Sequence, residues 1–232
     1  MENVLMLMIG VSILLAFIVI IAFIWGFKNK QFTENNGFLE LNDSEEALND
    51  AIILEQRKME LKNMKKALFL DRDGVINKDF SYVYELEKLV FMPNIFEIVK
   101  FFQDKDYLIF IITNQSGVGR GYFTKEQMDI FNEAILNEFK NHKINISKIY
   151  SCLHIPSDNC ECRKPKAGLI LQAAKEFNLD LFNSIFIGDK VSDMQVAINA
   201  NINNRYLFNE DLKEFEYCKK VNNLLDIKKD YE

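Results

Sequence analysis

Two aspartates separated by one residue directly follow a short apolar run. Residues 67–70 are entirely apolar, and Asp71, Asp73 and Gly74 come next. Because alternate residues of an extended chain face the same side, both carboxylates should project together from the carboxyl end of a strand. Open parallel sheets bind their ligands at that end. The spacing therefore predicts a site with two cooperating carboxylates, although Asp and Gly are also ordinary turn residues.

Further polar clusters follow other apolar runs. The predicted strands after the first are residues 108–112, 149–153, 184–187 and 205–208. The predicted helices are one opened by Pro93, then 124–140, 167–178 and a closing helix at 212–227. Strands alternating with helices predict an α/β fold with a doubly wound, mainly parallel, Rossmann-like sheet and no large cap domain. Four polar clusters then meet along one sheet edge, which favours a functional site over chance turns.

The clustered side chains suit phosphoryl transfer. Asp71 and Asp189 would supply carboxylates for an octahedral Mg²⁺ that neutralises a phosphate dianion. Asp71 would attack phosphorus to form an aspartyl-phosphate, and Asp73 would protonate the leaving alkoxide and later activate water. The expected donors to the transferring oxygens are Thr113, Asn114, Lys164 and Lys190. A lysine taken singly is more often a solvated surface residue.

Three cysteines and a histidine lie close together in the sequence. The spacing is Cys152-x-His154-x5-Cys160-x-Cys162. Three thiolates and one imidazole form a closed tetrahedral Zn²⁺ set with no open position for a catalytic water, so we predict structural zinc. The metal would brace the loop that carries Arg163 and Lys164. Buried free thiols are the alternative, and the fourth cysteine, Cys218, is expected in the closing helix.

Composition limits the classes of function. The 232 residues are 49% hydrophobic with a net charge of −6, which argues against a nucleic-acid partner. Four cysteines are too few for a disulfide scaffold in a chain of this length, which favours a metal site in a reducing compartment. We expect residues 64–232 to form a monomeric catalytic domain that acts on a small phosphorylated molecule.

The amino-terminal residues have a different character. Residues 3–27 carry no charge, and a helix of this length, rising roughly 1.5 Å per residue, would cross a bilayer core. We therefore predict a transmembrane anchor in residues 1–30, with a cleaved signal peptide as the rival. Lys28 and Lys30 would place the following domain in the cytoplasm, at the inner membrane. Residues 31–63 are predicted to be an acidic, partly helical linker.

Four motifs within residues 64–232 resemble those of the haloacid dehalogenase superfamily. They are Asp71-x-Asp73-Gly74, Thr113, Lys164 and Gly188-Asp189-x-x-x-Asp193. Longer stretches resemble the D-glycero-D-manno-heptose 1,7-bisphosphate 7-phosphatases, and they include Asp71-Arg72-Asp73-Gly74-Val75-Ile76-Asn77, Thr113-Asn114-Gln115-Ser116-Gly117 and Cys162-Arg163-Lys164-Pro165. Histidinol-phosphate phosphatases are close relatives. The gap between His154 and Cys160 is similar to theirs, whereas Ser116 and Arg120-Gly121-x-Phe123 are typical of the heptose enzymes.

The resemblance implies a role for each matching residue. Asp71 would be the nucleophile and Asp73 the proton donor, and Mg²⁺ would bind Asp71, the backbone of Asp73, and Asp189. The implied substrate contacts are Asp79, Tyr82, Thr113, Asn114, Gln115, Ser116, Arg163, Lys164 and Lys190. The implied reaction removes the 7-phosphate of the heptose bisphosphate during synthesis of ADP-heptose and lipopolysaccharide core precursors.

Residues 1–60 resemble the small single-span maturation proteins of cbb3-type cytochrome oxidases. The matching features are Met6-Leu7-Met8-Ile9-Gly10, Ala22-Phe23-Ile24-Trp25-Gly26, Lys30-Gln31-Phe32 and the acidic stretch after them. The chain would then be a fusion of two proteins. A hypothesis of another class follows, in which the chain is chiefly a membrane-tethered oxidase assembly factor that interacts with other assembly components and carries the phosphatase as a passenger.

Overall fold

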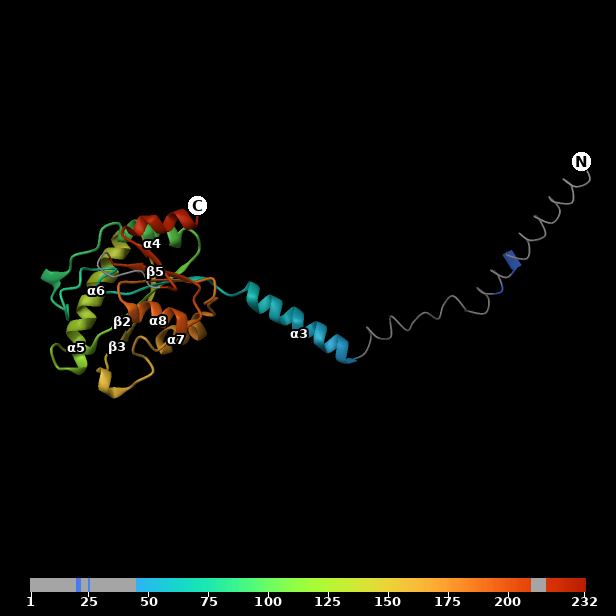
Figure 1. Ribbon diagram of the computed structural model, residues 1–232, viewed down its shortest axis with the longest axis horizontal. Helices are drawn as coiled ribbons and strands as arrows, with labels where there is room; N and C mark the ends of the chain where they lie inside the picture. The colour runs from blue at the N-terminus through green and yellow to red at the C-terminus, as the bar shows by residue number, and fades with distance from the viewer. Residues whose placement is uncertain (1–19, 22–24, 26–44, 210–215) are drawn as a thin grey trace, which may run out of the picture. The chain divides into compact units, whose positions relative to one another are not determined.

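The computed structural model describes residues 20–21, 25, 45–209 and 216–232 (Figure 1). The chain divides into two compact units, Met1–Glu60 and Leu61–Glu232. Helix α3, Glu45–Lys62, falls within the predicted linker. No helix in the described part of the chain has the length and apolar character needed to cross a membrane. The predicted anchor, residues 3–27, lies almost entirely outside the described residues.

The second unit is built on a six-stranded sheet in the order β3-β2-β1-β4-β5-β6. The strands are β1 Ala67–Leu70, β2 Leu108–Asn114, β3 Ile146–Cys152, β4 Ile185–Gly188, β5 Asn204–Phe208 and β6 Lys219–Val221. Every neighbouring pair is parallel, and Phe69 of β1 is opposite both Phe110 of β2 and Phe186 of β4. The predicted α/β fold with a parallel sheet is confirmed.

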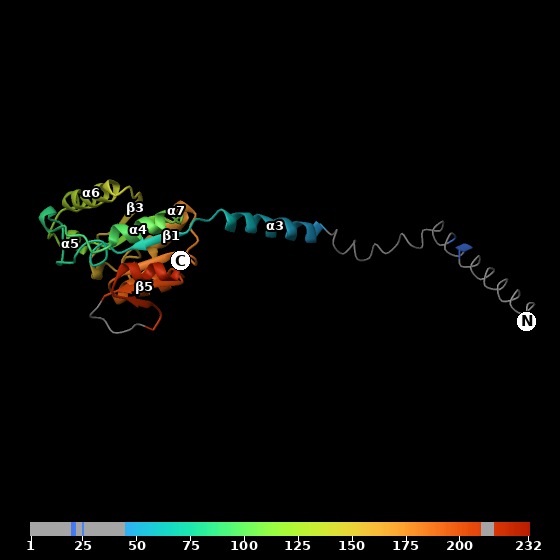
Figure 2. The ribbon, with the colours of Figure 1, turned by 90° about the horizontal axis from the view of Figure 1, so that it is seen from above.

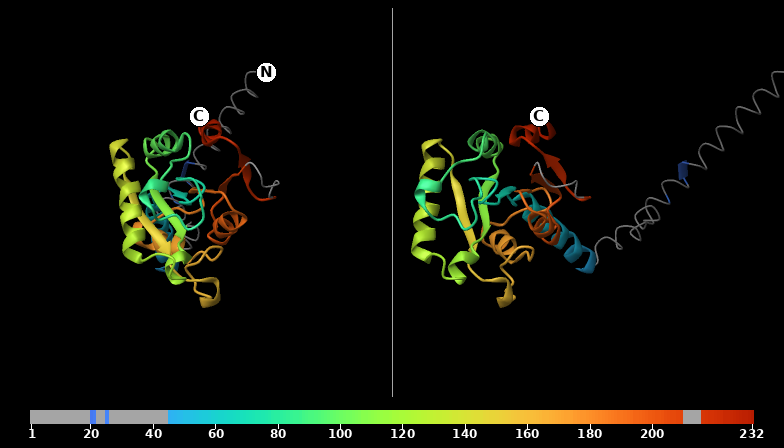
Figure 3. Two further views of the ribbon diagram at one scale, coloured as in Figure 1. Left: turned by 90° about the vertical axis from the view of Figure 1, so that its left-hand side faces the viewer. Right: turned by 60° about the vertical axis from the view of Figure 1, so that its left-hand side comes forward.

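Helices cover both faces of the sheet (Figure 3). On one face lie α4 Ile95–Gln103, α6 Lys125–Asn141 and the 3₁₀ helix η3 Leu224–Asp230, and on the other lie α7 Gly168–Phe177 and α8 Val191–Asn199. Leu68 and Leu70 pack on the face covered by α4, α6 and η3, while Ala67 and Phe69 pack on the face covered by α7 and α8. Because both faces are buried, β1 is a continuous apolar run instead of an alternating one.

Short elements fill the connections after the strands. They are η1 Leu86–Lys88, α5 Ser116–Gly119 and η2 Pro156–Asp158. Helix α6 begins at Lys125, one residue after the predicted start, and Thr124 is its N-cap. The Thr124 hydroxyl accepts a hydrogen bond from the Gln127 backbone, and the Gln127 side chain accepts one from the Thr124 backbone. Helix α4 begins later than predicted, after Asn94 in a left-handed conformation with φ 64°. Asparagine tolerates this conformation better than most residues.

The predicted closing helix at 212–227 is wrong. Residues 219–221 form β6, which pairs with β5 through Tyr206 and Lys219, and a 3₁₀ helix begins at Leu224. Residues 210–215 lie outside the described residues. Cys218 therefore precedes a strand instead of lying in a helix. A three-residue strand is too short to display its periodicity, and the buried pair Leu224 and Ile227 has the spacing of a helix face.

Candidate active site

The candidate site lies at the carboxyl ends of three adjacent strands. Asp71 follows β1, Thr113 lies near the end of β2, and Asp189 follows β4. Since β2, β1 and β4 are neighbours in a parallel sheet, these side chains meet at one edge. The loop after β1 and helix α5 lie at the same end of the unit (Figure 2).

Three buried carboxylates surround one buried lysine. Carboxylate oxygens of Asp71, Asp189 and Asp193 all lie within 4.8 Å of one another. Lys164 Nζ is 2.7 Å from Asp71 Oδ1 and 2.7 Å from Asp193 Oδ1. Burial, and then the Asp193 charge, raise the pKa of Asp71 well above its usual range. Burial favours the neutral amine of Lys164, but the Asp193 and Asp71 charges outweigh it and raise its pKa.

The carboxylate cluster fits a hard divalent cation. The three carboxylates exceed the two ammonium groups beside them, those of Lys164 and Lys190, and Asp189 Oδ1 is buried without a hydrogen-bond partner. Burial raises the pKa of Asp189 to about 6. Gly74 is required beside it, because a Cβ there would lie 2.1 Å from Asp189 Oδ2 and the φ of 97° disfavours other residues. Carboxylate oxygens are the ligands that Mg²⁺ takes in proteins.

Asp193 belongs to this cluster, although the sequence reading left it without a role. It is fully buried, and its Oδ2 accepts the backbone N–H groups of Asp189 and Lys190 at 3.2 and 3.0 Å. It therefore fixes the turn from β4 into α8 and holds Lys164 by charge. The motif Gly188-Asp189-x-x-x-Asp193 includes this residue, but spacing alone does not show that the Asp193 carboxylate pairs with the Lys164 ammonium group.

Asp73 points into a network of amide donors. Its Oδ1 accepts a hydrogen bond from Asn77 Nδ2 at 2.9 Å, and its Oδ2 accepts one from Gln115 Nε2 at 2.8 Å. Gln115 Nε2 also donates to Thr113 Oγ1 at 2.8 Å. Because the Thr113 oxygen accepts this bond, its own hydrogen remains available for a phosphate oxygen. Gln115, predicted to contact substrate, thus also orients two neighbouring site residues.

The loop that carries Lys164 is fixed by two asparagines. Asn114 Oδ1 accepts the Lys164 backbone N–H at 3.1 Å, and Asn114 Nδ2 donates to the Lys164 carbonyl at 3.3 Å. Asn199 of α8 donates to the Pro165 carbonyl at 2.9 Å. Lys164 Nζ also donates to the Ile112 carbonyl at 3.1 Å. Asn114, predicted as a substrate contact, therefore also holds the lysine in register with β2.

A cavity of about 250 Å³ opens above the carboxylates. Its lining residues are Asp73, Asp79, Ser81, Tyr82, Asn114, Gln115, Ser116 and Lys190. Lys190 Nζ lies 2.9 Å from Asp79 Oδ2 and 3.6 Å from Asp189 Oδ2, and these charges raise its pKa although burial opposes them. Thr113 and Lys164 are buried and do not line the cavity. Arg163 does not line it and instead donates to the His154 carbonyl at 3.3 Å.

Aromatic contacts join the two loops that border this cavity. The Tyr82 and Tyr122 rings meet edge to face at 4.8 Å, and Tyr84 stacks on Phe123 at 4.8 Å. Gly117 is needed here because a Cβ would lie 2.1 Å from the Phe123 ring. The loop after β1 and the segment after α5 therefore form one wall.

The predicted cysteine and histidine ligands are close together. Cys162 Sγ lies 3.2 Å from Cys152 Sγ, 3.4 Å from Cys160 Sγ and 3.2 Å from His154 Nδ1. Cys152, Cys160 and Cys162 form no disulfide bonds. A tetrahedral zinc with bonds of about 2.3 Å would hold sulfurs about 3.8 Å apart, so the group would need to open by only about half an ångström. The donor set fits zinc.

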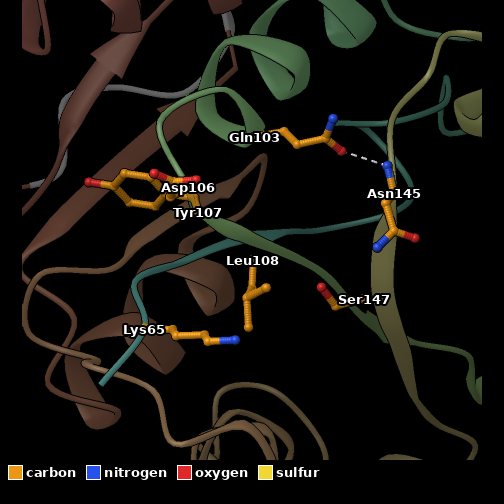
Figure 4. Close-up of a pocket in the computed structure, with 7 residues that line it drawn as sticks. All are labelled: Lys65, Gln103, Asp106, Tyr107, Leu108, Asn145 and Ser147. Atoms are coloured by element: carbon orange, nitrogen blue, oxygen red, sulfur yellow. Dashed lines mark hydrogen bonds between the residues drawn. The ribbon is translucent and has the colours of Figure 1, made fainter. Parts of the chain in front are cut away.

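A second hollow of about 450 Å³ lies at the opposite end of the strands (Figure 4). It is lined by Lys65, Gln103, Asp106, Tyr107, Leu108, Asn145 and Ser147. Gln103 Oε1 accepts the Asn145 backbone N–H at 2.6 Å across it. Its single carboxylate and single ammonium group do not form a reactive pair, so we assign the chemistry to the smaller cavity.

Comparison with known proteins identifies the family. The phosphatase of Campylobacter jejuni named D-glycero-alpha-D-manno-heptose-1,7-bisphosphate 7-phosphatase is 50% identical over 162 residues, covering 70% of this chain and 93% of that protein. The chain belongs to the heptose-1,7-bisphosphate 7-phosphatase family. The Helicobacter pylori protein named D-glycero-beta-D-manno-heptose-1,7-bisphosphate 7-phosphatase is 44% identical over 170 residues, covering 71% of this chain and 98% of that protein. The family model described as polynucleotide kinase 3 phosphatase matches residues 50–222 of this family member.

Two solved structures support the fold assigned to this chain. The D,D-heptose 1,7-bisphosphate phosphatase of B. bronchiseptica, crystallised with magnesium and phosphate, superposes with a TM-score of 0.65 at 24% identity. That match covers 72% of this chain and 97% of the other. A putative haloacid dehalogenase-like phosphatase from Mesorhizobium loti gives a TM-score of 0.64 at 27% identity, covering 71% and 84%.

The amino-terminal residues match a different family. The model of the cbb3-type cytochrome oxidase maturation protein covers residues 3–40. This agrees with the resemblance seen in the sequence, although these residues lie almost wholly outside the described structure. The chain thus joins a segment similar to the oxidase-maturation proteins to a member of the heptose phosphatase family.

Proposed function

We propose that the chain hydrolyses the 7-phosphate of D-glycero-D-manno-heptose 1,7-bisphosphate. The observation that carries the proposal is the 50% identity to the C. jejuni enzyme over nearly its whole length. The buried group of Asp71, Asp189, Asp193 and Lys164 beneath the cavity supports phosphoryl chemistry. In this role the product would feed the synthesis of ADP-heptose and lipopolysaccharide core precursors.

Asp71 is the nucleophile in this proposal. Its Oδ1 is held by Lys164 Nζ at 2.7 Å and by the Arg72 backbone N–H at 2.8 Å, which leaves Oδ2 to attack phosphorus. The Thr113 hydroxyl and the positive charge of Lys164 would stabilise the negative charge on the transferring oxygens. Bound to Asp71, Asp189 and the Asp73 backbone, Mg²⁺ would neutralise the charge of the phosphate dianion.

Asp73 would move the protons. As the ester bond breaks, its carboxyl group protonates the leaving alkoxide of the sugar. The resulting carboxylate then takes a proton from the water that hydrolyses the aspartyl-phosphate on Asp71, which returns both residues to their starting states. Asn77 and Gln115 orient it for both steps.

Substrate preference is the sharpest test of the proposal. On the full chain, kcat/KM for the heptose 1,7-bisphosphate should exceed that for histidinol phosphate by at least about 100-fold, or ~2.7 kcal/mol. Lys190, half-exposed at the cavity wall, suits a second phosphate better than the ammonium and imidazole of histidinol phosphate. Phosphate release should be measured for both anomers, histidinol phosphate and a 3′-phosphorylated oligonucleotide. A preference for either of the last two would refute the assigned substrate.

The thiol cluster is proposed to bind one structural zinc through Cys152, His154, Cys160 and Cys162. Burial is outweighed by hydrogen bonds from Cys162 and Cys152, which lower the pKa of Cys160 to about 7. Burial raises the pKa of Cys152 to about 12, so zinc binding would have to displace the proton of that thiol. Cys160→Ser should release the zinc and lower activity, because Arg163 and Lys164 follow the cluster directly. Cys218→Ser is the matched control and should retain the metal. Elemental analysis of both variants decides, and zinc retained by Cys160→Ser contradicts the assignment.

A second function is favoured for residues 1–40 by the oxidase-maturation match. We propose that residues 3–27 anchor the chain in the inner membrane, with the phosphatase on the cytoplasmic side, and that the segment takes part in assembling a cbb3-type oxidase. Membrane fractionation of cells with and without residues 1–63 tests the anchor. Oxidase activity in the same cells tests the assembly role. If removing residues 1–63 leaves the membrane-bound fraction unchanged, the anchor is refuted. If it leaves oxidase activity unchanged, the assembly role is refuted.

A further inference from the structure

Arg72, between the two proposed catalytic aspartates, is completely buried. It is the largest side chain in the described structure with essentially no exposure. An isolated buried guanidinium would cost several kcal/mol, so its partners must compensate for lost water. Its guanidinium lies over the Phe131 ring of helix α6, with Cζ 4.8 Å from the ring centroid.

The guanidinium joins Asp73 to helix α6. Its Nε donates to Asp73 Oδ1 at 3.1 Å and its Nη2 to Asp73 Oδ2 at 2.9 Å, a two-point contact that fixes the carboxylate plane. Nη2 also donates to the Val83 carbonyl at 2.9 Å, and Nη1 donates to Asn132 Oδ1 at 3.1 Å. Asn132 is buried on α6 and lies 60 residues away in sequence.

We propose that Arg72 and Asn132 are positioning residues that hold Asp73 in place to protonate the leaving group. The inference rests on the proposed proton-transfer role of Asp73. Asn77 and Gln115 reach Asp73 from connecting segments, whereas Arg72 is anchored to α6 in the core. Asn132 acts through Arg72, because its amide oxygen accepts the guanidinium N–H that faces away from Asp73.

The dependence of rate on the leaving group separates positioning from mere structural support. An aryl phosphate with a good leaving group, such as p-nitrophenyl phosphate, needs little proton transfer, while an alkyl phosphate needs it fully. The second-order constant kcat/KM reports only the steps through the first irreversible one, here transfer to Asp71. A misplaced Asp73 therefore lowers kcat/KM in proportion to the basicity of the leaving group. A general loss of structure lowers it equally for all esters.

The test uses the full chain, Mg²⁺ and a series of phenyl and alkyl phosphates. Arg72→Lys should lower kcat/KM about 100-fold for the poorest leaving group and less than about twofold for p-nitrophenyl phosphate. Asn132→Leu, which keeps the size but removes the acceptor, should give about a tenfold loss with the same dependence. Asn132→Asp keeps an acceptor at this position and should retain most of the kcat/KM that Asn132→Leu loses. Asn137→Leu, at an exposed position on the same helix, is the matched control.

The outcomes are distinguishable from failure of the assigned substrate. The ester series requires only that the chain hydrolyse phosphate monoesters, so it remains informative if the heptose bisphosphate is not turned over. A uniform loss for every ester, or no loss in either variant, overturns the positioning role. If Arg72→Lys does not fold, as judged by circular dichroism, the two Asn132 variants carry the same comparison.

Discussion

Asp71→Asn should abolish phosphatase activity while leaving the protein folded. The amide is nearly isosteric with the carboxylate but cannot attack phosphorus, so we expect turnover to fall by at least about 10⁴-fold, or ~5.5 kcal/mol in barrier. Stability should change little, because the amide oxygen can still accept a hydrogen bond from Lys164, and Lys164 keeps its ion pair with Asp193. Phosphate release and urea unfolding on the same preparation measure the two effects.

Asp106→Asn is a matched control for this variant. Asp106 is exposed at the opposite end of the sheet and has a φ of 64°, a conformation that asparagine also tolerates. It should retain full activity. Substantial turnover by Asp71→Asn, beyond what deamidation back to aspartate explains by mass spectrometry, would rule out Asp71 as the nucleophile.

Lys164→Met should have the largest effect on stability. The substitution removes the ammonium between Asp71 and Asp193, and breaking a buried ion pair by removing one partner costs about 3–5 kcal/mol. It also removes positive charge beside the proposed nucleophile Asp71, so we expect kcat/KM to fall about 10²–10³-fold. Urea unfolding in EDTA measures the stability loss, and added Mg²⁺ should restore part of it.

The pH dependence of this loss has a definite sign. The pKa of Asp71 is already raised in the folded protein, and removing Lys164 raises it further. A folded state that binds more protons than the unfolded state loses stability as pH rises. The difference in the free energy of unfolding between wild type and Lys164→Met should therefore be small near pH 5 and grow toward pH 8. Lys175→Met, at an exposed position on α7, should show no such difference. Equal stability of Lys164→Met and wild type at pH 8 would contradict the buried ion pairs.

The sequence could predict the strand ends and their chemistry because these signals are local. The apolar run before Asp71 and the carboxylate spacing to Asp73 are readable without any tertiary contact. The same holds for the ligand spacing from Cys152 to Cys162, which the fold brings together as expected. The carboxyl-terminal elements were not readable, because β6 is defined by its pairing with β5 and not by its own three residues.

The sequence by itself determined which residue types carry the chemistry, whereas the tertiary structure decided which of them meet. From the sequence, Lys164 could have been a surface lysine. Only the strand order, with β1 between β2 and β4, brings Lys164 between Asp71 and Asp193. Arg72 could likewise have faced solvent. Its burial against Asn132 follows from the packing of α6 on the sheet, because a hydrogen bond between distant segments forms only when the fold brings both partners together.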